Sequence, residues 1–303
     1  MAGTASAMPV KGKNQSAQVL SVRGRLFLID CGEGVQSRLV EAGIPMMKID
    51  SIFISHIHGD HVFGLFGLLS TLGMKGRRIP LGIYAPANFG PIMKFFLSYY
   101  GDGLGYELNF TPLAMKAPER VFESKSIEVL AFPLNHRIET YGFLFREKEP
   151  QLNVRKEAVA VLGLSLTEIG AIKRGEDVVR GDGSVIYNAD VAYRPYSPRS
   201  YAYCSDTAPF PQLPEWVHGV DLLYHECTYL AAYEEQARLR YHSTTLQAAA
   251  CAAQAGAGKL VIGHYSSRCR DPRTYEAECR TVFPETWAAS DGDVFEIPFI
   301  KAK

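Results

Sequence analysis

The segment FISHIHGDHVFGLFGLL (Phe53–Leu69) concentrates three of the eight histidines of the chain and one aspartate directly after an apolar run. Metal binding needs several borderline donors that converge without protons. A tight turn can aim His56 and His58 in one direction and Asp60 and His61 in another. Four donors on so few residues do not easily surround one ion. The cluster therefore favours two neighbouring ions rather than a solvated polar turn.

Further candidate ligands follow later strand-like runs: His136 in PLNHR, Asp206 in YCSDT and His264 in VIGHYS. A lone histidine at a strand end is more often structural, but the cluster makes these positions candidates by geometry. A carboxylate can bridge two cations, so Asp206 can serve both. The predicted ligand sets are His56, His58, His136 and Asp206 for one ion, and Asp60, His61, His264 and Asp206 for the other. Positions left for water are typical of a catalytic zinc site.

The rest of the chain alternates short β-rich runs with helical patterns, which predicts an α/β fold. QVLSVRGRLFLIDCGEG (18–34) reads as a hairpin, and HVFGLFGLLSTLGMKG (61–76) as one helix. The other predicted strands and helices are IDSIFISH (49–56), RIPLGIYAP (78–86), FGPIMKFFLSYYG (89–101), SIEVLAFPLNH (126–136), SYAYCSDTA (200–208), VDLLYHECTY (220–229), TTLQAAACAAQAGAG (244–258) and KLVIGHYS (259–266). Polar side chains at strand exits gather on one rim of such a sheet, where sites are usually built.

Composition narrows the class of protein. The formal net charge of zero indicates no general attraction to nucleic acid, so a polyanion would need a local basic patch. The six cysteines form no CxxC pair and read as reduced thiols of a cytoplasmic protein. The start of the chain lacks the apolar core of a secretory signal, and no stretch approaches 18 apolar residues. We expect no membrane association.

Several blocks together resemble ribonuclease Z, the tRNA 3′-processing endonuclease family, from Gly3 to about Asp293. The HxHxDH cluster alone specifies only the metallo-β-lactamase fold; its GDHxxGLxGLL extension, HExT and HST are more specific. The matching blocks are LIDCGEGVQ, FISHIHGDHVFGLFGLL, NHRIETYGF, YCSDT, HECTY, YHSTT and GHYSSR. The resemblance implies one αββα sandwich over residues 1–303 with an arm inserted at 151–188, two zinc ions (Zn2+) per chain, precursor tRNA as substrate, and a homodimer.

The resemblance also implies catalytic roles. Asp60 would be both a ligand and the proton acceptor from the attacking water. His242 in YHST would protonate the leaving 3′-oxygen, with Glu226 in HECTY holding its imidazole charged and oriented; alternatively this pair only positions ligands. His225 reads as structural. Asp30 in LIDCGEG either orients a ligating histidine or caps a turn.

Substrate contact needs cations near the site. Arg268, four residues after His264, can place its fork on a phosphate, and Ser266 can assist. PVKGKN (9–14) resembles the loop with which the family senses the CCA end of tRNA, so Lys11 and Lys13 are candidate contacts. Lys13 replaces the usual arginine and loses its bidentate fork, which puts CCA discrimination in doubt. The alternative is a solvated basic turn.

The predicted arm departs from the family pattern. GAIKRGEDV and GDGSVIY fit the flexible exosite that grips tRNA, but LSLTEIG stands where the family has a Gly-Pro element. Basic and acidic residues nearly balance, so the arm's cations would act locally; these are Lys173, Arg174, Arg155 and Lys156. At the other end, only Met1 and Ala2 precede Gly3, where the family usually has a β-strand. Either an edge strand is missing or the chain starts late.

Two rival functions remain open. A metallo-β-lactamase-fold hydrolase of small molecules, such as an arylsulfatase, lactonase or cyclic phosphodiesterase, would share the ligands but would need no arm or basic loops. An RNA-binding module with an inactive site is disfavoured by the intact ligand set. The residues do not decide between zinc and manganese.

Overall fold

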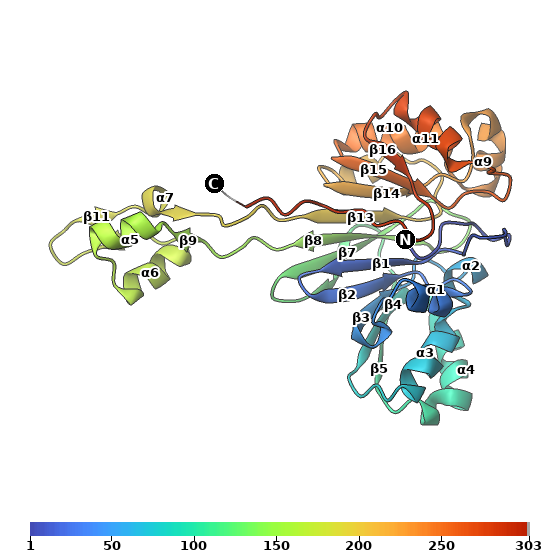
Figure 1. Cartoon of the computed structure of the whole chain (residues 1–303), viewed down its shortest axis with the longest axis horizontal. Helices are drawn as coiled ribbons and strands as arrows, with labels where there is room; N and C mark the ends of the chain where they lie inside the picture. Colours follow the sequence, from blue (N-terminus) through green and yellow to red (C-terminus); the bar gives the residue numbers. More distant parts are fainter. Residues whose placement is uncertain (302–303) are drawn as a thin grey trace.

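The computed structural model describes residues 1–301, which form a four-layer αββα sandwich with a projecting arm (Figure 1). One five-stranded sheet has the order β1-β2-β3-β4-β5, and one seven-stranded sheet has the order β16-β15-β14-β13-β8-β7-β6. The first sheet consists of β1 (Gln18–Val22), β2 (Arg25–Ile29), β3 (Ile49–Phe53), β4 (Leu81–Pro86) and β5 (Leu108–Leu113). The second consists of β6 (Glu119–Glu123), β7 (Ile127–Pro133), β8 (Tyr141–Glu147), β13 (Ser200–Cys204), β14 (Leu222–Glu226), β15 (Lys259–Gly263) and β16 (Thr286–Ala288).

Helices cover the outer face of each sheet (Figure 1). The first sheet packs against α1 (Val35–Glu41), α3 (Leu65–Met74) and α4 (Gly90–Tyr100). The second packs against α8 (Leu213–Trp216), α10 (Thr245–Ala255) and α11 (Pro272–Arg280), with α9 (Glu234–Arg240) nearby. Among residues 1–301, no helix combines the length and the apolar character that crossing a bilayer requires.

Alternating side chains divide the interior into three apolar layers. In β2, Phe27 and Ile29 face the second sheet, whereas Leu28 faces the helices. This period of two is the normal side-chain alternation of a strand buried on both faces. The layer between the sheets is rich in aromatic rings, such as Phe53 and Phe143, whose ring centroids lie 5.3 Å apart.

The helix predicted over residues 61–76 is wrong in one respect, because two helices occupy this stretch. A short helix, α2 (Gly59–Val62), ends before Gly64, and α3 starts at Leu65. A side chain at Gly64 would stand 2.1 Å from the carbonyl oxygen of Gly32, so only glycine fits this close approach. Four strands of the two large sheets were not predicted from the sequence, namely β5, β6, β8 and β16, and neither were the short strands of the arm.

The strands that matter for the site all end at the same edge of the sandwich. β2, β3, β4 and β5 are parallel to one another, as are β13, β14, β15 and β16. β7 is antiparallel to β8, which is antiparallel to β13, so β7 also points to that edge. Loops after the carboxyl ends of such strands are the usual place for a ligand site.

The arm separates β8 from β13 in sequence and projects away from the sandwich (Figure 1). Its elements are β9 (Asn153–Val154), α5 (Lys156–Leu162), α6 (Leu166–Lys173), β10 (Val178–Val179), β11 (Val185–Ile186), α7 (Asn188–Val191) and β12 (Ala192–Tyr193). Leu164, Ile172, Ile186 and Val191 form a small apolar core of its own. A capping box joins Ser165 and Glu168 at the start of α6.

Candidate metal centre

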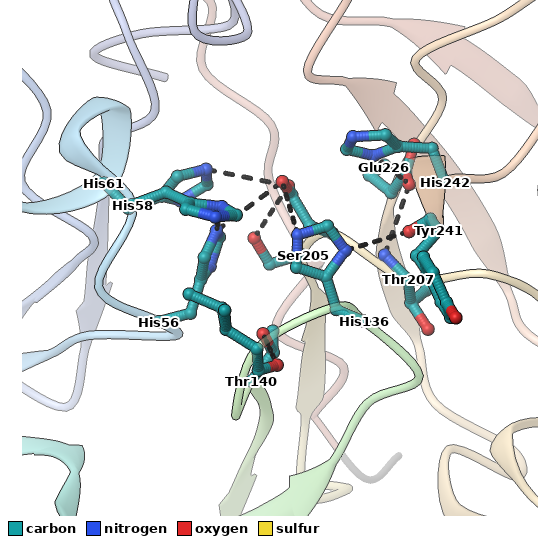
Figure 2. Close-up of polar contacts among 12 residues, drawn as sticks. His56, His58, His61, His136, Thr140, Ser205, Thr207, Glu226, Tyr241 and His242 are labelled. Carbon is teal, nitrogen blue, oxygen red and sulfur yellow. Dashed lines mark hydrogen bonds and ion pairs between the residues drawn. The ribbon is translucent and has the colours of Figure 1, made fainter. Parts of the chain in front are cut away.

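The loops after four strands, β3, β7, β13 and β15, bring the predicted metal ligands together. Donor atoms of His56, His58, His136 and Asp206 lie within 4.8 Å of one another, as do those of Asp60, His61 and His264. Figure 2 shows His56, His58 and His61 on one loop, with the His136 ring facing them from a second loop. The two groups adjoin through Asp206, whose carboxylate contacts members of both.

Each oxygen of Asp206 faces a different group. Its Oδ2 atom lies 3.5 Å from His56 Nε2 and 3.8 Å from His136 Nε2. Its Oδ1 atom lies 3.6 Å from His61 Nε2 and 3.2 Å from His264 Nε2. Donor atoms around one tetrahedral zinc ion lie about 3.3 Å apart, because each is about 2.0–2.1 Å from the ion. The spacings therefore fit two cations bridged by one carboxylate.

Three of the histidines have a ring nitrogen without a hydrogen-bond partner, directed at the space between the two donor groups. His136 Nδ1 donates to the carbonyl oxygen of Tyr241 at 3.0 Å, and His264 Nδ1 lies 3.0 Å from the Thr228 hydroxyl. The Nε2 atoms of His61, His136 and His264 are buried without a hydrogen-bond partner. Buried polar atoms are almost always paired, so these nitrogens fit a bound cation.

Asp30 supports the HxHxDH loop from the side opposite the metal ligands' donor atoms. Its fully buried carboxylate lies 2.7 Å from His61 Nδ1 and accepts hydrogen bonds from the Tyr203 hydroxyl at 2.6 Å and from the Ser55 backbone and hydroxyl. A carboxylate on Nδ1 leaves Nε2 of His61 aimed at the site. The backbone of Asp30 has a φ of 55°, and that of His264 a φ of 60°. Such left-handed conformations are costly for these residues and tend to cluster at functional sites.

The protonation of three of the histidines supports the same arrangement. Burial, reinforced by neighbouring imidazoles, lowers the pKa of His56 and His58, and burial lowers that of His136. These rings are therefore neutral and able to bind a cation. Burial raises the pKa of Asp60, but His61 and His264 outweigh it and hold that carboxyl well below its usual range. Asp60 is consequently an anion at neutral pH. At His61, burial lowers the pKa, but Asp60, Asp30 and Asp206 outweigh burial and raise the pKa, so a bound cation would displace a proton there.

Beside the ligands, Glu226 and His242 form a buried pair. Glu226 Oε1 lies 2.9 Å from His242 Nδ1, and the carboxylate also accepts the Thr228 hydroxyl and the backbone amides of Thr207, Thr228 and Ser243. Burial lowers the pKa of His242, but Glu226 and then Asp206 more than offset it and raise the pKa to about 9. The imidazole is charged at neutral pH. Figure 2 shows the pair on the far side of the His136 ring from the HxHxDH loop.

His242 also lies close enough to be a ligand itself, because one of its nitrogens is within 4.8 Å of donor atoms of Asp206 and His264. The hydrogen bond between His242 Nδ1 and Glu226 favours the other role, in which Glu226 orients His242 as a charged proton donor. His225, the neighbour of Glu226, is buried and contacts the Glu226 carbonyl through Nδ1 at 2.7 Å.

The candidate substrate contacts occupy two places. Lys13 Nζ lies 3.5 Å from the carbonyl oxygen of Cys269, so the PVKGKN loop adjoins the loop that carries Ser266 and Arg268. Lys11 and Arg268 are exposed there. Lys173 and Arg174 instead end α6 in the arm, and Arg174 forms a two-point ion pair with Glu176.

Sequence reasoning missed the hydroxyl groups that support the ligands. Ser55 precedes His56, and Thr228 follows Glu226 by two residues. Thr228 Oγ1 contacts Glu226, His264 and, at 3.3 Å, His242 Nδ1. Ser55 and Thr228 could have been found from the sequence, because each lies within two residues of a candidate site residue at the end of a predicted strand.

Comparisons with known proteins show which family the chain resembles. A family model described as Anti-Pycsar protein Apyc1 matches residues 1–95. A protein named Ribonuclease Z from Bacteroides fragilis (strain YCH46) is 39% identical over 289 residues, covering 95% of this chain and 95% of that protein. Another of the same name, from Cytophaga hutchinsonii, is 40% identical over 296 residues, covering 97% of this chain and 94% of that protein.

Solved structures lead to the same family. Human tRNase Z, short form, superposes with a TM-score of 0.71 at 25% identity, covering 98% of this chain and 97% of that one. A metallo-β-lactamase fold protein from Bacillus subtilis superposes with a TM-score of 0.67 at 20% identity, covering 97% and 96%, and speaks for the fold alone. The predicted metallo-β-lactamase fold is confirmed, and the chain belongs to the ribonuclease Z family.

Proposed function

We propose that the protein is a tRNA 3′-processing endoribonuclease that works with two zinc ions and removes the 3′ trailer of precursor tRNA. The observation that carries the proposal is the division of Asp206 between the two donor groups. A single structural zinc needs no such bridge, whereas two-metal hydrolysis of phosphodiesters does. The full-length match to proteins named ribonuclease Z supplies the substrate class.

The seven ligands predicted from the sequence would hold the ions. His56, His58 and His136 would bind one, Asp60, His61 and His264 the other, and Asp206 both. Two bound cations would neutralise the scissile phosphate and lower the pKa of a water beside it. The donors mix imidazole nitrogen with carboxylate oxygen, which suits zinc and also admits manganese.

The remaining roles are divided between Asp60 and His242. Asp60 lies beside His61 and His264 and faces the site, so it is placed to accept the proton of the attacking water. His242 is charged, so it can donate a proton to the leaving ribose 3′-oxygen. Glu226 would keep that imidazole charged and correctly turned through the 2.9 Å contact with Nδ1. After each cycle the proton returns from solvent, since His242 is partly exposed.

Two loops beside the site would bind the RNA backbone. Arg268 is exposed and follows His264 by four residues, and the hydroxyl of Ser266 accepts the Arg268 backbone amide at 3.3 Å. Lys11 and Lys13 approach from the neighbouring loop. We assign these residues to the phosphates on either side of the cleaved bond.

The arm would hold the tRNA body, but it projects from the end of the sandwich opposite the edge that carries the metal ligands of the same chain. β8 runs from the site edge to the arm, and β13 returns along it. The five residues of β13 alone separate the site from the start of the arm by about 16 Å. A homodimer resolves this geometry, because the arm of one subunit can then serve the site of the other.

A direct assay tests the proposal. Purified protein is incubated with precursor tRNA labelled at both ends, and in parallel with bis(p-nitrophenyl) phosphate and a cyclic mononucleotide. We expect one endonucleolytic cut at the 3′ side of the tRNA body, lost on chelation and restored by zinc. Hydrolysis of the cyclic nucleotide with intact tRNA would instead indicate a small-molecule phosphodiesterase. Asp206→Ala, which removes the bridging ligand, is the control for contaminating nuclease.

A further inference from the structure

The connection between the sandwich and the arm is a weak point in the backbone. The ladder between β8 and β13 ends where the Glu147 amide donates to the Arg199 carbonyl at 2.8 Å. Pairing resumes only between β9 and β12. In the described chain, no backbone hydrogen bond joins the intervening segments, 148–152 and 194–198. These segments, here called the stalk, contain three prolines, which lack the amide such bonds need.

The C-terminal segment 294–301, here called the brace, runs along the stalk toward the arm (Figure 1). The Ser197 amide donates to the Ile300 carbonyl at 3.2 Å, and Tyr196 pairs with Lys301 in an antiparallel bridge. The Arg199 side chain donates to the Ile297 carbonyl at 3.2 Å. The brace therefore supplies backbone partners to one half of the stalk, 194–198, which the other half does not give it.

A buried ion cluster lies where the ladder ends. The Glu147 side chain is 1% exposed and accepts Arg199 Nη2 at 2.7 Å and the Arg199 amide at 3.0 Å. Arg23 Nε, from the turn between β1 and β2, lies 2.7 Å from the same carboxylate. One carboxylate thus joins the first sheet to the two residues that flank the stalk, since Glu147 precedes it and Arg199 follows it. Its burial is costly without these partners, so loss of either arginine should weaken the junction.

Aromatic rings extend the cluster to the brace. The Arg23 guanidinium carbon lies 3.9 Å from the Tyr196 ring centroid and 5.2 Å from that of Phe299. The two rings themselves are 5.0 Å apart. A guanidinium stacked on two rings gains more than its ion pair alone. Arg23, which belongs to the sandwich, therefore contacts both the stalk and the brace.

We propose that the brace and the Arg23–Glu147–Arg199 cluster lock the arm at one angle to the sandwich, so that Arg23 and Glu147 are positioning residues for tRNA binding. The inference rests on the proposed function, in which the arm holds the tRNA body. An unlocked arm would sample many angles relative to the sandwich, and only a few of these angles would allow tRNA to bind. If the competent fraction falls to about one tenth, the apparent dissociation constant rises about tenfold.

Arg23→Asn tests the proposal, because asparagine tolerates the left-handed φ of 49° at this position. We expect KM for precursor tRNA to rise about tenfold with kcat unchanged, and no change with bis(p-nitrophenyl) phosphate. Arg23→Lys keeps the charge but not the stacked fork, so partial rescue is expected. Arg25→Asn is the matched control: Arg25 lies in the same hairpin and pairs with Asp50 at 2.7 Å, outside the cluster.

A measurement without catalysis separates the two proposals. Spin labels on Glu157→Cys in α5 and Lys94→Cys in α4 report the angle of the arm, since all six native cysteines are buried. We expect one narrow distance distribution in the parent, and a broad one with Arg23→Asn but not with Arg25→Asn. An unchanged distribution with Arg23→Asn would overturn the lock. A parent that shows the narrow distribution but leaves precursor tRNA uncut would overturn the proposed function alone.

Discussion

The candidate metal centre and the arm place the same kinds of charged residue in opposite environments. In the metal centre, charged groups are buried and each is fixed by long-range partners, as Asp30 is by Ser55 and Tyr203. In the arm, charged groups are mostly exposed and pair with near neighbours, as Arg174 does with Glu176. Burial strengthens electrostatics and fixes geometry, which the chemistry needs. Exposure keeps the arm adaptable, which suits contact with a large substrate.

The sharpest test of this contrast is the removal of the bridging ligand. Asp206→Ala would remove the carboxylate that four imidazole nitrogens share, and Asp60 would remain beside only two of them, those of His61 and His264. Loss of a residue that only orients a metal ligand typically costs about 10- to 100-fold. We expect the loss of the shared ligand to lower activity on every phosphodiester further, by about 10³-fold or more. Metal analysis should show fewer than two ions per chain. A variant that keeps both ions and its rate would contradict the bridging role.

A second change in the metal centre should depend on the leaving group. A ribose 3′-oxygen leaves poorly without a proton, whereas a nitrophenolate does not need one. We therefore expect His242→Ala to slow tRNA cleavage by about 10²–10⁴-fold and nitrophenyl ester cleavage much less. Metal content should stay normal. If metal is lost, or if both substrates slow equally, His242 is a ligand or a positioning residue, as its distance to Asp206 and His264 allows.

In the arm, the effect should be limited to large substrates. Replacing residues 151–193 by a short Gly-Ser linker should raise KM for precursor tRNA by about 10²-fold and spare bis(p-nitrophenyl) phosphate. Because Arg174 and Arg180 already pair with Glu176 and Glu168, few phosphates should be neutralised. The salt dependence of KM should then change by only about one or two counterions. Equal loss on both substrates would mean that the arm is structural.

The smallest effect concerns the junction between the two regions. Burial raises the pKa of Glu147, but hydrogen bonds and charge from Arg199, together with the charge of Arg23, outweigh it and hold that pKa below the usual range of a glutamate. A depressed carboxyl pKa adds stability above the unfolded value, and that stability is lost as pH falls through the folded value. Glu147→Gln should lower Tm by about 2–5 °C above pH 5. The difference from the parent should shrink below pH 4.5; a constant difference would argue against an ion pair.

Much of the metal centre was predictable because its residues follow local rules. A histidine cluster after a strand, and single polar residues at later strand exits, converge in any α/β sandwich whose strands are parallel. His136, Asp206 and His264 could be named for this reason before their distances were known. The two-helix break at Gly64 was not predictable, since it depends on contact with Gly32, a residue distant in sequence.

From the amino-acid sequence alone came the fold class, the family resemblance and the set of candidate ligands, because these depend on short blocks and their spacing. Only the tertiary structure decided which oxygen of Asp206 faces which group, which histidine Asp30 holds, and how Thr228 joins Glu226 to His264. It also brought Arg23 against Phe299, from opposite ends of the chain. Such contacts depend on sheet order and strand direction, which no local pattern specifies.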